Sequence, residues 1–208
     1  NASPGRQVVV TGAGMQANET VRVYWDSTSS TPIGTTVANG AGNWRITFTL
    51  PDATGGTHQI LARGASSNRN AGSTFTVNSA LERAPISGVP GTSISVTVRG
   101  FGAGEIVSLT FMHSSTSQHA LGSVRTDANG SGTTSVTLPS STVGQHDYRG
   151  VGQSSGRTAW GALWIQTSMS LSSEQGASGD SVTATVRGLP GSTSARVAWN
   201  QSGSSNGT

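Results

Sequence analysis

Hydrophobic and polar positions alternate along most of the chain. In residues 20–25 the apolar side chains of Val21, Val23 and Trp25 occupy every second position, and residues 44–50 repeat the pattern from Trp44 to Leu50. A spacing of two residues places these side chains on one face of an extended strand, whereas a helix needs spacings of three and four. The pattern therefore predicts short β-strands, each with one buried face.

The chain also repeats itself with a period of 88 residues. Residues 34–51 match residues 122–139, and residues 91–100 match residues 179–188, both at this spacing. At the start of the chain Pro4-Gly5 matches Pro90-Gly91 at a spacing of 86, so one loop differs in length. We expect residues 1–78 to form a repeat that lacks its first strand, 79–166 a complete repeat, and 167–208 the N-terminal part of a third. Because both ends cut through a repeat, we expect the chain to be a segment of a longer array.

Turn signals such as Asn39-Gly40 and Asn129-Gly130 separate the alternating segments. About seven short strands in a repeat of this length predict an all-β fold of tandem immunoglobulin-like antiparallel β-sandwiches. The third repeat continues the pattern with Ala195, Val197 and Trp199, which predicts another half-buried strand. The linkers, residues 78–80 and 166–168, are short, so we expect neighbouring sandwiches to form a semi-rigid rod.

Composition narrows the class of protein. The chain holds 33 Ser and 27 Thr, no Cys and no Lys, and its charged residues make up only 10%. Residues of this kind disfavour helix, and no apolar stretch is long enough for a membrane helix, so we expect no direct membrane insertion. The calculated pI is near 10.6. However, the twelve Arg lie singly along the chain, and nucleic-acid binding needs clustered cations, so we do not expect it.

Several motifs give the chain a family resemblance. Residues 85–91, read Pro-Ile-Ser-Gly-Val-Pro-Gly, and residues 94–101, which end in Arg-Gly-Phe, resemble the opening of IPT/TIG-type immunoglobulin-like domains. Residues 127–130, 137–139 and 144–146 resemble bacterial immunoglobulin-like repeats of secreted multidomain proteins. The resemblance implies a bacterial cell-surface or secreted protein in which such domains are spacers, adhesive modules or accessories to an enzyme. The first repeat departs from it, with Asn39 at the position of Asp127, so a role that requires Asp127 is not shared by both repeats.

No set of residues predicts catalysis, a bound metal or a cofactor. His58 and His146 occupy the same repeat position, where a general base and a structural corner residue are the alternatives; we favour the corner, because the repeat supplies no nucleophile or carboxylate beside it. Asp127 and Asn129 have the two-residue spacing of calcium loops but lack a closing Glu, so a hairpin turn explains them better. The six-residue spacing of His113 and His119 is not that of a metal site.

One position-specific contact patch stands out. Trp160 and Trp164 lie four residues apart in a segment whose inward positions are Leu163 and Ile165, so both should project from the outer face. Immunoglobulin topology places the strands with Arg149 and Met112 beside them, which predicts an outer-face patch of Trp160, Trp164, Arg149 and Met112. Contact with another protein, packing against a neighbouring domain and stacking on a sugar are the three explanations for exposed Trp residues.

The leading functional hypothesis is a non-enzymatic structural or spacer segment of a long extracellular bacterial surface protein, able to assemble into a fibre or surface layer. The alternative is a carbohydrate-binding or adhesive module, as an accessory to a secreted hydrolase for example. Expected partners are neighbouring copies of the same protein, other surface proteins or a glycan. The truncated repeats would offer exposed strand edges that a neighbouring chain completes by β-strand addition.

Overall fold

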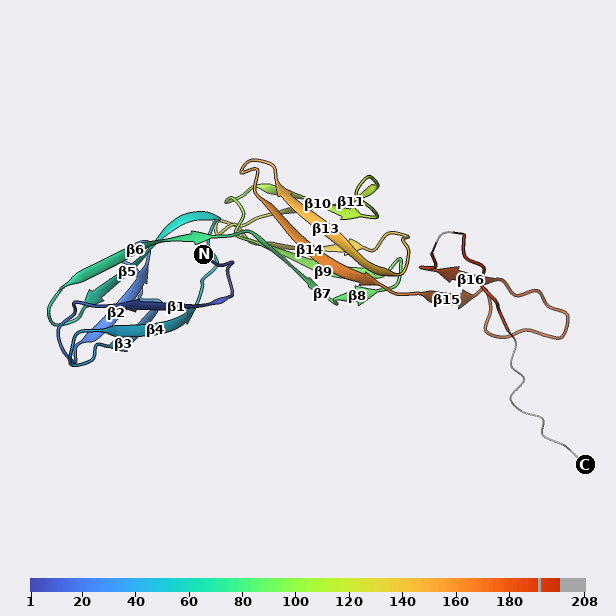
Figure 1. Ribbon diagram of the computed structural model, residues 1–208. Helices are drawn as coiled ribbons and strands as arrows, with labels where there is room; N and C mark the ends of the chain where they lie inside the picture. The colour runs from blue at the N-terminus through green and yellow to red at the C-terminus, as the bar shows by residue number, and fades with distance from the viewer. Residues whose placement is uncertain (191, 199–208) are drawn as a thin grey trace, which may run out of the picture.

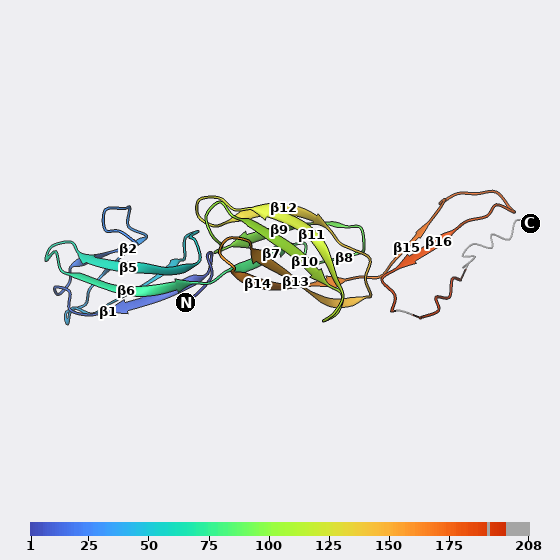
Figure 2. The ribbon, with the colours of Figure 1, turned by 90° about the horizontal axis from the view of Figure 1, so that it is seen from above.

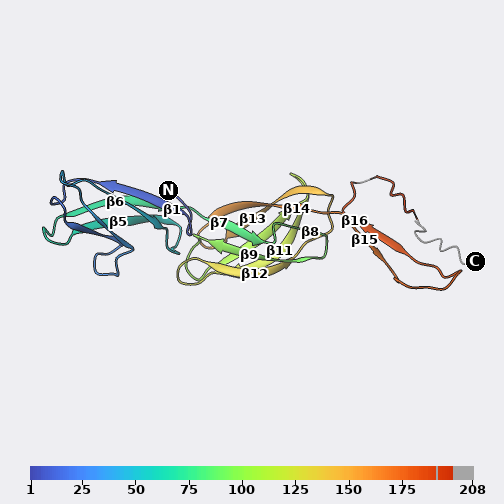
Figure 3. The same ribbon diagram turned by 90° about the horizontal axis from the view of Figure 1, so that it is seen from below.

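A computed structural model of the chain describes residues 1–190 and 192–198, and the regular elements in this part are all strands (Figure 1). Three views show two β-sandwiches and a C-terminal hairpin placed one after another along a single long axis (Figures 1, 2 and 3). Among the described residues there is no helix able to cross a bilayer. The predicted fold class, tandem immunoglobulin-like antiparallel sandwiches, is confirmed.

The N-terminal sandwich packs a four-stranded sheet against a two-stranded one. The larger sheet has the order β3-β2-β5-β6, with β3 at Gly34–Val37, β2 at Thr20–Trp25, β5 at Gly56–Gly64 and β6 at Asn70–Val77. The smaller sheet pairs β1, Gln7–Gly12, with β4, Trp44–Thr49. The alternating residues meet between the sheets as the pattern predicts, and the core includes Val21, Val23, Ile46, Phe48 and Leu50.

The central sandwich has the same arrangement with two further strands. One sheet has the order β11-β10-β13-β14-β8, formed by Gln118–Arg125, Ile106–Met112, Gly144–Gly152, Thr158–Ile165 and Ser87–Gly88. The other has the order β12-β9-β7, formed by Gly132–Thr137, Ser93–Arg99 and Ala80–Ala84. Strand β8 runs parallel to β14, and an isolated parallel bridge from Ala2 to Val77 holds the same place in the N-terminal sandwich.

The largest difference between the sandwiches lies beside β1. In the central sandwich β7 pairs with β9, and the inward residues Ile94 and Val96 are 1% and 0% exposed. In the N-terminal sandwich no strand of the described part pairs with the corresponding edge of β1, and the matching residues Val8 and Val10 are only half-buried. A groove of about 420 Å³ therefore opens between β1 and β6.

The C-terminal hairpin pairs β15, Ser168–Leu171, with β16, Ala184–Arg187. Its apolar side chains stay uncovered, with Met169 60% and Leu171 45% exposed. The strand predicted at residues 195–199 does not form in the described residues 192–198, where Val197 is 59% exposed, and Trp199 lies outside the described residues. The prediction was wrong here because alternation describes a strand only when neighbouring strands supply hydrogen bonds and a core.

Candidate functional site

The outer face of the central sandwich carries the two exposed Trp residues. Along β14 the side chains alternate: Leu163 and Ile165 are buried in the core, whereas Trp160 and Trp164 are 55% and 51% exposed. Ala162 lies between the two indoles on the same face, and four residues of strand separate them by about 13 Å. A small side chain thus leaves an open space between two aromatic rings.

The neighbouring strands bring the other two predicted residues to this face. Arg149 on β13 pairs with Trp160 in the strand register, and its guanidinium carbon lies 5.5 Å from the centre of the Trp160 ring. Met112 stands at the end of β10, the next strand of the sheet, and is half-buried. The structure therefore places Trp160, Arg149 and Met112 on three adjacent strands.

Met112 and Trp160 line a shared groove of about 440 Å³ at the end of this face. Its other walls come from the loop after β10 and from the start of β13, and its lining includes His113, Ser114, Gln145, His146 and Asp147. Asp147 pairs with Ala162 and Gln145 with Trp164, so these two polar side chains lie directly beside the row of indoles. Sequence analysis missed Gln145 and Asp147, although their outward phase, four and two residues before Arg149, was a usable signal.

The charges at the groove are few. Asp147 carries a carboxylate and Arg149 a guanidinium. Burial lowers the pKa of His113, and the nearby His119 and His146 lower this pKa further, so its imidazole is neutral at pH 7. The groove therefore has one anionic side chain, Asp147, among aromatic, amide and hydroxyl groups, and the cationic Arg149 lies next to it on β13.

The N-terminal sandwich has no such face. Its residues at the positions of Trp160, Trp164 and Arg149 are Gly72, Thr76 and Leu61. The patch is thus a property of the second repeat and not of the fold.

The two repeat histidines are corner residues, as predicted, but the expectation that no carboxylate lies beside them was wrong for His58, whose Nδ1 is 2.7 Å from Oδ2 of Asp26. His146 is 8% exposed, and its Nε2 lies 2.8 Å from the carbonyl oxygen of Thr142. His58 makes the same contact with the carbonyl of Thr54, also at 2.8 Å. His113 and His119 have ring centres 6.1 Å apart, and in the described residues no group of three or more His, Asp or Glu is arranged to hold a metal ion.

The turn role of Asp127 is confirmed, and it is shared. Its Oδ1 accepts hydrogen bonds from the backbone N–H of Asn129 at 2.8 Å and of Ser131 at 3.0 Å. The Oδ1 of Asn39 accepts the equivalent bonds from Ala41 and Asn43, both at 2.9 Å. Both turn signals are therefore confirmed, and this turn does not require Asp127, because an amide oxygen closes it as well as a carboxylate does.

Two buried glutamates hold loops together, and sequence analysis did not identify either. Glu105 is 4% exposed and accepts hydrogen bonds from the backbone N–H groups of Gly102, Ser154 and Ser155 and from the Ser155 hydroxyl. Burial raises its pKa, but the hydrogen bonds, first those from Ser155, outweigh burial and hold the pKa below its usual value.

Glu19 forms the same arrangement in the first repeat. It accepts hydrogen bonds from Gln16, Ser66 and Ser67. These bonds, above all that from the Ser67 backbone N–H, lower the pKa of Glu19 to about 2. Both carboxylates are thus committed to loop structure and are not open to a ligand.

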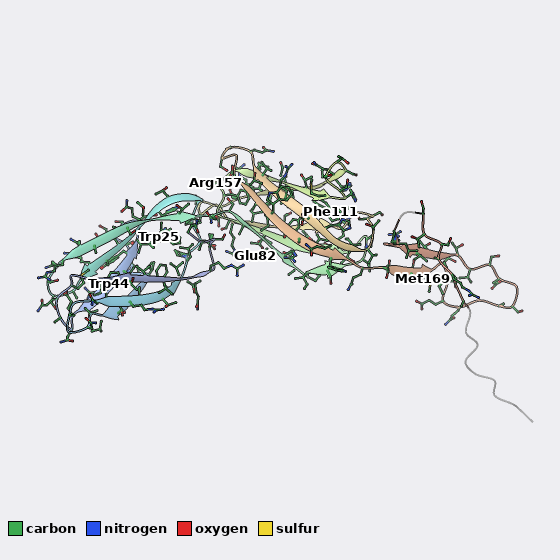
Figure 4. The ribbon with its side chains drawn as sticks, viewed as in Figure 1. Trp25, Trp44, Glu82, Phe111, Arg157 and Met169 are labelled. Carbon is green, nitrogen blue, oxygen red and sulfur yellow. The ribbon has the colours of Figure 1, made fainter. Side chains whose placement is uncertain are left out.

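A compact junction joins the two sandwiches. The backbone N–H of Gly55 donates to the carbonyl of Phe101 at 3.1 Å, and Arg99 forms an ion pair with Asp52 at 2.5 Å. Arg157, labelled with Glu82 near this junction in Figure 4, lies so close that a Cβ on Gly55 would meet it at 2.8 Å. The side chains and backbone of both sandwiches therefore interlock at this point.

The junction between the central sandwich and the hairpin is similar. The N–H of Val143, which is 88 residues after Gly55, donates to the carbonyl of Gly188 at 2.6 Å. Ser140 stands at the position of Asp52, so the ion pair of the first junction has no equivalent here. The backbone contact recurs, whereas the charged contact does not.

No protein-family model matches the chain, and no curated protein matches it. Among solved structures, the tetra-tandem repeat in the extending region of a large adhesion protein aligns over 89% of this chain and 63% of its own length, with 12% identity and a TM-score of 0.35. Invasin, a bacterial integrin-binding protein, aligns over 81% of this chain and 42% of its own, with 14% identity and a TM-score of 0.28.

A third similar structure is SGBP-B of the Bacteroides ovatus mixed-linkage glucan utilization locus, solved in complex with a mixed-linkage heptasaccharide. It aligns over 80% of this chain and 44% of its own length, with 15% identity and a TM-score of 0.36. The chain thus spans less than two thirds of the length of each of these structures.

Proposed function

We propose that the chain is a non-enzymatic spacer segment of an extracellular bacterial surface protein, in which immunoglobulin-like repeats of the IPT/TIG kind, with boundaries at 1–78, 79–166 and 167–208, form a semi-rigid rod. The observation that carries the proposal is the junction. The same loop position, Gly55 in one repeat and Val143 in the next, donates its N–H to the following unit.

Short linkers support the same function. Strand β6 ends at Val77 and β7 begins at Ala80, and β14 ends at Ile165 and β15 begins at Ser168. The linker residue Ser79 is itself bound, because its hydroxyl donates to the carbonyl of Gly100 at 2.8 Å. A linker of two residues, in which Asn78 is hydrogen-bonded to the sandwich before it and Ser79 to the one after it, leaves little freedom for bending.

The carboxylates fit a structural role. Glu19, Glu105 and Asp127 organise loops, and Asp52 pairs with Arg99 across the junction. Asp26 accepts a hydrogen bond from the backbone N–H of Gln59 and contacts His58. These groups have partners that fix the fold, which leaves few carboxylates for acid–base chemistry.

The stiffness of the junction is measurable, because the chain has no Cys and accepts spin labels at chosen sites. Cysteines replace two exposed residues, Ser29 and Ala128, one in each sandwich, and electron–electron double resonance gives the distance distribution between the labels. We expect a narrow distribution, and a four-residue Gly-Ser insertion after Asn78 should broaden it. A distribution in the uninserted chain as broad as in the inserted control would contradict a rod.

The exposed edge of β1 supports a more specific proposal, that copies of the chain assemble into a fibre. The groove beside β1 is apolar. In the central sandwich β7 fills the equivalent place. Strand β15 has the repeat position of β7, and its Met169 and Leu171 are exposed, so β15 of a neighbouring copy could fill the groove. Addition of that strand, which would exchange its pairing with β16 for pairing with β1, would join copies head to tail, which gives an open polymer and not a closed dimer.

Light scattering after size-exclusion chromatography tests the assembly. We expect the mass to rise with concentration, and Val10→Asp in the groove to return the chain to a monomer. Val37→Asp is the matched control, because Val37 is 61% exposed and lies outside the groove. A monomer at every concentration would eliminate assembly by this edge and leave the spacer function standing.

A further inference from the structure

The groove on the central sandwich holds polar groups that have no partner in the protein. Within the described residues, the side chains of Asp147 and Gln145 make no hydrogen bond or ion pair, in contrast to Glu19, Glu105, Asp26, Asp52 and Asp127 elsewhere. Both lie beside the exposed indoles, since Asp147 pairs with Ala162 and Gln145 with Trp164. The carboxylate of Asp147 is thus open to solvent level with the gap between the two indoles, and the amide of Gln145 lies beside Trp164, which is itself just outside the lining of the groove.

This combination suits one ligand chemistry. The flat faces of Trp160 and Trp164 contact apolar C–H surfaces, and the carboxylate and amide accept or donate hydrogen bonds at the edge of such a surface. A pyranose ring with equatorial hydroxyl groups presents both features, an apolar face of C–H groups and a rim of hydroxyls. The volume of about 440 Å³ lies in the range of small-ligand sites.

The charges favour an uncharged sugar. Asp147 would repel an acidic polysaccharide, and Arg149 is engaged with the Trp160 ring at 5.5 Å. The spacing of about 13 Å between the two indoles is bridged by several linked sugar units and not by one.

We propose that the outer face of the central sandwich binds a neutral polysaccharide, with Trp160 and Trp164 stacking on pyranose rings and Asp147 and Gln145 hydrogen-bonding their hydroxyl groups. Arg149 is a positioning residue that holds the Trp160 ring through its cation–π contact. Met112 and His113 form the opposite wall of the groove.

A protein partner is the competing occupant, and it fits less well. A stable protein interface buries about 800 Å² on each side and excludes unpaired charges from its centre. Here the open carboxylate of Asp147 lies near the middle of the face, between Arg149 and Gln145 along β13. That position suits a hydroxyl-rich ligand better than an apolar protein surface.

Affinity electrophoresis of the full chain tests the proposal. Native gels contain hydroxyethylcellulose, xylan or, as the acidic control, polygalacturonate. We expect at least one neutral polysaccharide to retard the chain, and polygalacturonate not to. Trp160→Ala and Trp164→Ala should each weaken binding about tenfold, which corresponds to about 1.4 kcal/mol. Asp147→Asn tests hydrogen bonding at the groove with little change in shape, and it should weaken binding without altering the fold.

The control variant is Val37→Ala, an exposed apolar substitution on the N-terminal sandwich, and it should leave retardation unchanged. Circular dichroism of every variant shows whether the fold is kept. Two outcomes would overturn the proposal: migration unaffected by both neutral polysaccharides, or retardation that the double Trp160→Ala, Trp164→Ala variant retains. Loss of self-association in the double variant, without any polysaccharide retardation, would assign the face to protein contact. Neither outcome bears on the rod, which the spin-label distances test separately.

Discussion

Replacing Glu105 by Ala removes the acceptor that ties two loops of the central sandwich together. Three backbone N–H groups, those of Gly102, Ser154 and Ser155, and the Ser155 hydroxyl donate to its carboxylate. The partners lie 49 and 50 residues from Glu105 on one side and three on the other. The substitution therefore disconnects the turn before β10 from the loop between β13 and β14.

The cost follows from the donors left without an acceptor. A buried donor that loses its partner costs about 1–3 kcal/mol, and water reaches these loops once the side chain is gone, so the lower value applies. Three backbone donors then amount to about 3 kcal/mol. For a sandwich of this size the urea dependence of the free energy of unfolding is about 1 kcal/mol per molar, so the unfolding midpoint should fall by about 3 M.

Hydrogen–deuterium exchange with mass spectrometry, repeated across a urea series at pH 7, reads each sandwich separately. Peptides from β9 and β13 should lose protection at lower urea in the variant, while peptides from the N-terminal sandwich serve as an internal control. Ser155→Ala removes only the hydroxyl donor and should cost about 1 kcal/mol. A loss for Glu105→Ala below about 0.5 kcal/mol, the range of ordinary surface substitutions, would refute the reasoning.

Three further substitutions test a loop, the junction and the core. Because the pKa of Glu19 falls from 4.5 to about 2 on folding, it stabilises the N-terminal sandwich above pH 4.5. This contribution is lost as the pH falls toward 2, and Glu19→Gln should flatten the dependence of the urea midpoint on pH. Gly55→Val would place a Cβ 2.2 Å from the Gly100 carbonyl oxygen, so it should broaden the spin-label distances without lowering either unfolding midpoint. Gly161→Ala would place a Cβ 2.5 Å from the fully buried Tyr148 ring, and it should destabilise the central sandwich by about 2 kcal/mol in urea denaturation. An unchanged pH dependence, distance distribution or unfolding free energy would each contradict the corresponding contact as a source of stability or stiffness.

Much of the fold is visible in the alternation, because each strand has one buried face and therefore a period of two. The limits of this signal lie where a residue depends on a distant partner. Gly12 pairs with Trp44, whereas at the equivalent places Val98 pairs with Gly132. The larger residue of the pair is thus on the second strand in one sandwich and on the first strand in the other. This exchange is visible only when the two strands are paired, and not in the sequence of either strand alone.

The candidate site was only partly predictable for the same reason. Trp160 and Trp164 follow from the phase of β14, and Arg149 and Met112 from the order of the sheet. His113 joins the groove through a contact of its Nδ1 with the Ser141 hydroxyl at 3.1 Å, a partner 28 residues away that local sequence does not specify. The loop role of Glu105 depends on Ser154 and Ser155, far along the chain, so no local pattern marks it.

The parallel pairing of β8 with β14, and the bridge from Ala2 to Val77, has a mechanical consequence. Close to its entry into each sandwich the chain runs parallel to the strand by which it leaves, at β8 beside β14 and at Ala2 beside Val77, and the sandwiches follow one another along the long axis of the molecule (Figure 2). Tension applied to the two ends would load the backbone hydrogen bonds between those strands in shear. In the central sandwich the bonds from Trp164 to Ile86 and from Gln166 to Gly88 must then break together before the strands slide, whereas in peeling they would open one at a time. The fold is thus arranged to bear a pulling force, with its resistance concentrated where the chain enters and leaves each sandwich.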